Sequence, residues 1–154
     1  MALKTQLQAP EGKQEIVITR DFDIPVQSLF KAYIDPQIVE HWMSTKVVKL
    51  ENKAHGSWHF ITTDPMGNEH GFNGTIHEFV TNEKITRTFE MEGSPFPVQL
   101  EFLEFSATLE STSKLSMHII YKTLEHRDQM LKLPFAQGLN MAHNRLEEFI
   151  KSSN

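Results

Sequence analysis

The end of this chain carries a helical stripe in a sequence that otherwise has the patterns of strands. Over residues 139–150 the apolar or small side chains recur in steps of three and four, at Leu139, Ala142, Leu146, Phe149 and Ile150. This spacing is typical of one face of an amphipathic helix. Because the rest of the chain offers mainly sheet to cover that face, we expect the helix to pack against the concave side of a curved sheet. A space between the helix and the sheet is where we expect function to reside.

Most of the preceding chain is predicted to form antiparallel strands. Apolar and polar residues alternate, as they do in half-buried strands, in residues 15–22, 45–50, 56–63, 69–79, 84–90, 98–109 and 115–121. Within residues 98–109 the apolar positions change from even to odd after Phe102, which predicts a β-bulge that bends the sheet. Residues 1–13 show little periodicity and are predicted to be an N-terminal tail or a loosely attached arm, followed by a single domain over residues 14–152.

Two short helices are predicted after the first strand. Pro25 suits the first turn of a helix, and apolar residues follow it with helical spacing up to Ile34. Asp35 and Pro36 then form a second start signal, with Asp35 as N-cap and Pro36 at the first helical position. The predicted fold class is therefore α+β, with about six or seven strands curved around a long C-terminal helix.

Composition and charge exclude several classes of function. The formal net charge of −5 argues against nucleic-acid binding, and the dispersed Lys and Arg residues give no basic run for a membrane surface. No apolar run approaches the length needed to span a bilayer, and residues 1–12 lack a signal-peptide pattern, so we expect a cytoplasmic protein. The absence of cysteine removes disulfides, thiolate catalysis and cysteine-ligated metals.

The order of several short motifs resembles a known family. The opening motifs are Arg20-x-Phe22-x-x-Pro25, Phe30-x-Ala32, Asp35-Pro36 and Trp42. They are followed by Gly56-x-Trp58-x-Phe60, Gly67, Gly74-x-Ile76-x-Glu78, Lys84-Ile85, Met130, Gly138 and Leu146. Over residues 14–151 this series resembles the heat-shock-protein ATPase activator homologue family, which belongs to the START-like, or SRPBCC, superfamily of helix-grip proteins.

The resemblance implies a helix-grip fold with a cavity between the sheet and the long helix, in a family mostly without an assigned enzymatic activity. The chain departs from the family pattern at Met43, Ser44-Thr45, His55 and Leu139. Family members that stimulate a chaperone ATPase carry an additional N-terminal domain, which we expect this chain to be too short to contain.

Candidate ligand-binding residues are those expected to face the space between sheet and helix. The apolar candidates are Trp42, Trp58, Phe60, Phe72, Phe102, Met117 and Leu139. Each is either a wall of a ligand cavity or an ordinary core residue. His143, at the edge of the helical stripe, is either a core histidine bonded to a backbone carbonyl or a ligand contact. Arg20 is either paired with a carboxylate at the sheet rim or a second polar ligand contact.

No metal site, cofactor or catalytic residue is predicted. The eight histidines include no HExxH or HxH pair, and we interpret them as surface or individually hydrogen-bonded residues. The sequence contains no Gly-rich phosphate loop and no nucleophile elbow.

Three functional hypotheses remain open. The first is a protein that binds a small apolar molecule, either lipid-like or an apolar metabolite, between sheet and helix. The second is a protein-interaction or chaperone-associated stress-response module, with an exposed apolar patch around Pro95-Phe96-Pro97. The third is a cyclase- or hydratase-like enzyme, which requires two titratable groups inside the same cavity. A monomer and a homodimer are both compatible with the sequence.

Overall fold

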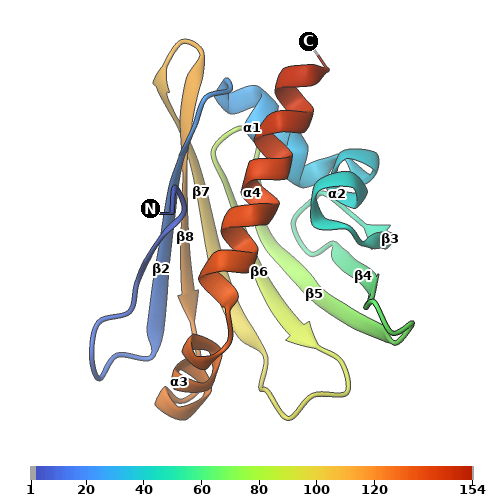
Figure 1. Ribbon diagram of the computed structural model, residues 1–154, viewed down its shortest axis with the longest axis vertical. Helices are drawn as coiled ribbons and strands as arrows, with labels where there is room; N and C mark the ends of the chain where they lie inside the picture. Colours follow the sequence, from blue (N-terminus) through green and yellow to red (C-terminus); the bar gives the residue numbers. More distant parts are fainter. Residues whose placement is uncertain (1–2, 154) are drawn as a thin grey trace.

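The fold is built on one curved antiparallel sheet with a long helix across its concave side (Figure 1). A computed structural model describes residues 3–153. In chain order the elements are β1 (Gln6–Gln8), β2 (Glu15–Phe22), α1 (Val26–Ile34), α2 (Pro36–Met43), β3 (Lys46–Leu50), β4 (Ser57–Thr63), β5 (Glu69–Val80), β6 (Lys84–Met91), β7 (Gln99–Leu109), β8 (Thr112–Ile120), α3 (Leu124–Lys132) and α4 (Phe135–Ser152). The strand order across the sheet is β1-β2-β8-β7-β6-β5-β4-β3.

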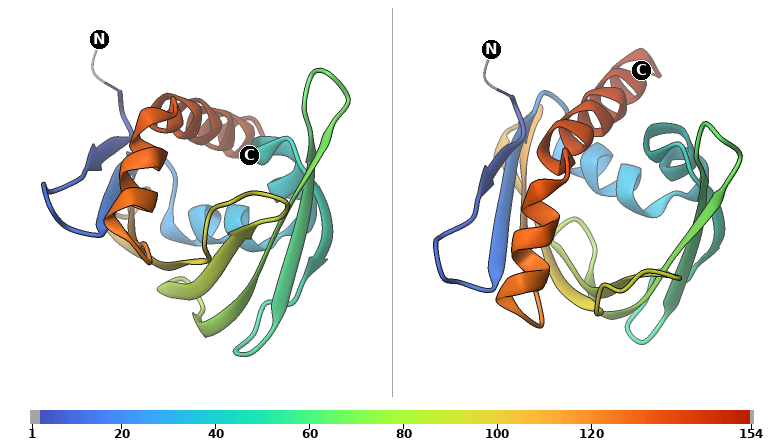
Figure 2. Two further views of the ribbon diagram at one scale, coloured as in Figure 1. Left: turned by 90° about the horizontal axis from the view of Figure 1, so that it is seen from below. Right: turned by 60° about the horizontal axis from the view of Figure 1, so that its bottom comes forward.

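The predicted α+β helix-grip architecture is confirmed, including the two short helices after the first long strand. Figure 2 shows that the sheet curves without closing and that α4 lies across its open side. Leu146 and Ile150 of the predicted stripe are buried, and Leu139, Ala142 and Phe149 pack against the core. The stripe therefore faces the sheet, because that is where the chain provides an apolar surface to cover it.

Two elements differ from the prediction. The described residues contain eight strands, because Gln6–Gln8 pair with β2 as an additional edge strand. Thr5, just before this strand, is only 2% exposed and its backbone N–H donates to Asn140 of α4. Residues 6–8 of the predicted N-terminal segment are therefore an attached strand, which was missed because an alternation of three residues is too short to recognise.

Helix α3 was also missed by the sequence analysis. Its buried residues are His126, Arg127 and Met130, so its inner face is largely polar and gives no apolar stripe. One signal was present in the sequence, since the Thr123 hydroxyl accepts a hydrogen bond from the His126 N–H as a helix N-cap does.

The bulge predicted within residues 98–109 is not at Phe102. Pairing between β7 and β8 runs without a shift from Leu100 to Ala107, and the register changes only between Ala107 and Leu109. The buried residues of β7 are all odd-numbered: Gln99, Glu101, Leu103 and Phe105. The prediction was wrong because two polar residues occupy inward positions, which reversed the apparent parity of the first half of the strand.

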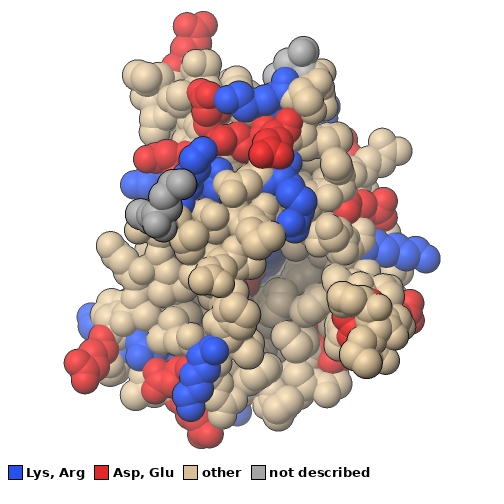
Figure 3. Space-filling model, viewed as in Figure 1, with Lys and Arg blue, Asp and Glu red and all other residues tan. Residues whose placement is uncertain are grey.

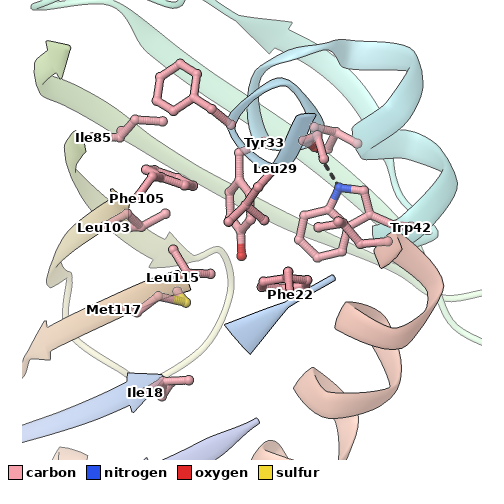
Figure 4. Packing of buried hydrophobic residues seen from close by; sticks show 14 of the residues in the cluster. Ile18, Phe22, Leu29, Tyr33, Trp42, Ile85, Leu103, Phe105, Leu115 and Met117 are labelled. Atoms are coloured by element: carbon pink, nitrogen blue, oxygen red, sulfur yellow. Dashed lines mark hydrogen bonds between the residues drawn. The ribbon is translucent and has the colours of Figure 1, made fainter. Parts of the chain in front are cut away.

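An aromatic core fills the part of the grip next to α1. Figure 4 shows Tyr33 between Phe105 and Trp42. The ring centroids of Phe105 and Trp42 lie 5.4 Å and 5.0 Å from that of Tyr33. The Trp42 indole N–H donates to the Ala32 carbonyl at 2.7 Å, which fixes α2 against α1. These contacts hold Tyr33 and Trp42 together next to α1.

Candidate functional site

Three adjoining pockets lie on the inner side of the sheet, and two of them also border the part of α4 between Phe135 and Arg145. The first has a volume of about 440 Å³ and is lined by Phe89, Met91, Gln99, Glu101, Met117, Ile119, Met130, Leu133, Pro134, Phe135 and Leu139. The second, of about 390 Å³, is lined by Tyr33, Trp42, Met43, Arg87, Met117, Phe135, Gly138, Leu139, Ala142 and Arg145. The third, of about 260 Å³, is lined by Met43, Thr45, Trp58, Phe60, Thr62, Phe72, Arg87 and Phe89.

These pockets share walls and form one region, which we call the grip pocket. Met117, Phe135 and Leu139 line both the first and the second pocket, and Arg87 lines both the second and the third. Figure 3 shows the molecule hollowed beside α4 on this face. These pockets lie in the region where the sequence predicted a space between sheet and helix.

Six of the nine candidate residues line the grip pocket. Trp58, Phe60 and Phe72 line the third pocket, on β4 and β5. Trp42 lines the second pocket, and Met117 and Leu139 line both the first and the second. Strand alternation and helical spacing place these side chains on the inner surface, which is why the sequence identified them.

Phe102 is not brought together with the other candidates. Its neighbours Glu101 and Leu103 face inward, so its own side chain is on the opposite face of β7. There its ring lies 6.1 Å from that of His118, measured between centroids. The cause is the polar inward face of β7, which made Phe102 look like the inward residue.

The floor of the grip pocket carries an ion pair that the sequence analysis missed. Arg87 of β6 lies directly opposite Glu101 of β7 in the sheet, and its Nε donates to the Glu101 carboxylate at 3.0 Å. The Gln99 side-chain amide donates to the other carboxylate oxygen at 2.9 Å. Both charged side chains are largely buried, with 13% of Arg87 and 6% of Glu101 exposed.

The guanidinium of Arg87 is also placed against an aromatic wall. Its central carbon lies 5.1 Å from the centre of the Trp58 ring, within the range of a cation–π contact. Within residues 3–153 only the Nε of this guanidinium has a hydrogen-bond partner. The two terminal nitrogens therefore remain available as donors at the wall shared by the second and third pockets.

His143 lies in the core and does not line the grip pocket. It is fully buried, with its Nδ1 at 3.0 Å from the Thr5 hydroxyl and its Nε2 at 3.1 Å from the Tyr33 hydroxyl. Burial, assisted by the nearby charge of Arg20, lowers the pKa of His143 to about 3. A neutral imidazole satisfies both hydroxyl groups, so the core interpretation holds, with hydroxyl groups in place of the expected backbone carbonyl.

Arg20 is buried between β2 and α4 rather than at the sheet rim. Its Nη1 donates to the Asn144 side chain at 2.8 Å, and its Nη2 lies 3.8 Å from the Glu147 carboxylate. Burial lowers the pKa of Arg20, and the charge of Glu147 opposes this shift. Arg20 lines none of the three pockets, so the two polar candidates belong to the packing of α4 on the sheet.

Neither a metal centre nor a membrane span is found in the part of the chain that the structure describes. Over residues 3–153 no group of three His, Asp or Glu side chains is arranged to hold a metal ion. In the same residues no helix combines the length and apolar character that crossing a bilayer requires.

Comparison with known proteins places the chain in a family. Residues 23–151 match the family described as Activator of Hsp90 ATPase homolog 1-like protein. The chain belongs to this family. The matched residues run from just after β2 to the last turn of α4, so the family pattern includes the grip pocket. No curated protein matches this chain.

Solved structures share the fold of this family member at low sequence identity. A protein from Rhodobacter sphaeroides has 18% identity and a TM-score of 0.87, with 97% of this chain and 99% of that chain covered. An Arthrobacter aurescens protein has 13% identity and a TM-score of 0.85, with 96% and 91% covered. Ms6760 from Mycobacterium smegmatis has 18% identity and a TM-score of 0.84, with 94% and 95% covered. At these identities the similarity shows the fold alone.

Proposed function

We propose that this protein binds a small, largely apolar molecule in the grip pocket. The observation that carries the proposal is open space between the sheet and α4, with component volumes of about 440 Å³ and 390 Å³. Ligand sites in proteins typically measure about 300–1,000 Å³ and combine apolar walls with a few fixed polar groups. The Arg87–Glu101 pair supplies such polar groups here.

The walls of the grip pocket favour an apolar occupant. Phe89, Met91, Met117, Phe135 and Leu139 face it from the sheet and from α4. A ligand that covers this surface gains about 25 cal/mol for each Å² of apolar area removed from water. The methionine side chains are flexible and polarisable, so they adapt to ligands of different shape.

A protein-interaction module is the second candidate, favoured by the exposed apolar residues at the α3–α4 junction. Leu131 is 36% exposed and Leu133 is 47% exposed. The patch expected at Pro95-Phe96-Pro97 is weaker, because the Phe96 ring stacks on His126 at 5.2 Å and is only partly exposed. Such a module predicts a co-purifying protein and no effect of small apolar compounds on stability.

An enzyme that uses the same cavity is the third candidate, with the Arg87–Glu101 pair as its specific support. These residues put one carboxylate and one permanently charged guanidinium in the pocket walls, so Glu101 is the group of the pair that can exchange a proton and Arg87 can stabilise negative charge. Turnover of a bound compound would distinguish this activity from simple binding.

The binding proposal is tested with a screen of apolar metabolites and fatty compounds, read by thermal unfolding and by tryptophan fluorescence. Trp42 and Trp58 are the two tryptophans of the chain, and both line the grip pocket. A bound compound is therefore expected to raise the melting temperature and to change the emission spectrum. No stabilisation by any compound would contradict the proposal.

Gly138 provides a matched pair of variants for this test. It lines the second pocket, and a Cβ built on it meets no atom within 4 Å. Gly138→Leu is expected to occupy the pocket and abolish binding, whereas Gly138→Ala is expected to retain it. Both changes improve helix propensity, so the fold is preserved. Equal binding by the two variants would show that ligands bind elsewhere.

A further inference from the structure

We infer that the grip pocket takes an amphiphile with a single carboxylate, whose head group lies between Arg87 and Arg145. This inference rests on the proposed function and specifies the class of ligand. Arg87 projects from β6 on the sheet and Arg145 from α4, and both line the second pocket. Two arginines thus line the same pocket, one from the sheet and one from the helix.

Arg145 is held in place by a contact that leaves its outer nitrogens unused. Its Nε donates to the Trp42 backbone carbonyl at 3.1 Å, near the C-terminal end of α2. This bond caps a helix terminus, as a positive charge does favourably. Within residues 3–153 no carboxylate lies within salt-bridge distance of Arg145, and its terminal nitrogens have no hydrogen-bond partner. The capping contact therefore uses the Nε of Arg145 and leaves its two terminal nitrogens without a role in the fold.

The balance of charge around the grip pocket selects the head group. The charged residues that line the three pockets are Arg87, Arg145 and Glu101, which are two cations and one anion. One positive charge, that of the solvent-exposed Arg145, therefore has no carboxylate partner in the wall of the second pocket. A single carboxylate neutralises it and accepts charge-assisted hydrogen bonds from guanidinium nitrogens.

The tail of such an amphiphile has a continuous apolar path. From the second pocket the shared walls Met117, Phe135 and Leu139 lead into the first pocket. There Met91, Met130 and Leu133 extend the apolar lining beneath the α3–α4 junction. A carboxylate between the arginines therefore places an attached hydrocarbon chain along the α3–α4 side of the pocket.

The inference is tested by comparing decanoate with 1-decanol, two chains of equal length that differ in their head groups. Binding is measured by tryptophan fluorescence at pH 8, where decanoate is ionised. The wild-type protein is expected to bind decanoate about tenfold more tightly than 1-decanol, as one charge-assisted contact allows. Arg145→Gln is expected to remove this preference without weakening 1-decanol binding, and Arg145→Lys to retain part of it.

Lys151→Gln is the matched control, because it removes one positive charge from the same helix at a residue that lines none of the three pockets. It is expected to bind both compounds as the wild type does. Equal affinities of the wild type for the two compounds, or an unchanged preference in Arg145→Gln, would overturn the head-group assignment and leave apolar binding intact. Failure of both compounds to bind would overturn the inference, and failure of the wider screen would overturn the proposed function as well.

Discussion

The imidazole of His143 is shielded from solvent between the hydroxyl groups of Thr5 and Tyr33. Its pKa of about 3 in the folded protein lies well below the value of about 6.5 expected in the unfolded chain. Between these values the unfolded state binds a proton that the folded state does not. The free energy of unfolding is therefore expected to fall as the pH falls from about 6.5 toward 3, by up to about 1.4 kcal/mol per unit from this residue alone.

Urea unfolding of the wild type and of His143→Gln at pH 7, 6, 5 and 4.5 checks this expectation. The stability advantage of the wild type should shrink steadily toward acid pH, since the variant has no histidine to protonate. Parallel stability profiles for the two proteins would contradict the assignment of His143 as a buried neutral residue.

The Arg87–Glu101 pair gives a second expectation at the level of single residues. Arg87→Gln leaves the buried Glu101 carboxylate without its cation, which is expected to destabilise the protein by about 3 kcal/mol. The double variant Arg87→Gln with Glu101→Gln removes both charges and should recover part of this loss. Chemical unfolding measures both effects. A double variant less stable than the single one would contradict the assignment of Arg87 as the group that compensates the buried charge of Glu101.

The inner-face apolar residues could be predicted from the sequence, and the polar ones could not. Alternation in β4 points Trp58 and Phe60 inward without any knowledge of other strands. Alternation also points the side chains of Arg87 and Glu101 inward. Charged residues in a strand are normally expected to face solvent, and only the pairing of Arg87 with Glu101 across β6 and β7 explains their inward position. The inward position of Glu101 made Phe102 look like the pocket residue of β7.

At the level of elements, the attachment of the N-terminal segment depends on the hydroxyl group of Thr5, the residue just before β1. Thr5 Oγ1 lies 3.0 Å from His143 Nδ1 and 3.4 Å from Arg20 Nη1, so the segment leading into β1 supplies polar partners to two buried groups. Thr5→Val keeps the side-chain shape and removes those partners, which is expected to cost about 1–3 kcal/mol. Thermal or urea unfolding measures the loss, and Thr5→Ser should remain close to the wild type. Equal stability of the two variants would show that the hydroxyl is not needed.

Local signals decided which elements could be predicted. Asp35 and Pro36 start α2 as expected, with the Asp35 carboxylate accepting from the backbone N–H groups of Gln37 and Ile38. The position of His143 and Arg20 was harder to predict, because their partners come from residues far away in the sequence. Thr5 and Tyr33 reach His143 across separations of 138 and 110 residues. Such contacts are not encoded in periodicity.

Over the whole molecule, stability should be unevenly distributed. The centre of the sheet buries Ile16, Leu103, Leu115 and Ile119 almost completely, whereas α3 leaves Leu124 and Leu131 exposed. Amide hydrogen exchange is therefore expected to be slowest in β2, β7 and β8 and faster in α3. A ligand in the grip pocket should slow exchange at the α3–α4 junction first, because Met130, Leu133 and Phe135 line the first pocket. Uniform slowing across the sheet would argue against that location.

The open sheet has two free borders, and both discourage the attachment of a further strand. On one border β1 offers only three residues. On the other, β3 has exposed Lys46 and Lys49, with an irregular register between Val47 and Lys49. Short length, lysine side chains and local kinks all prevent sheets from joining edge to edge. At high protein concentration, molecules of this protein should therefore resist aggregation by backbone hydrogen bonding between strand edges, even though the sheet of each molecule is not closed.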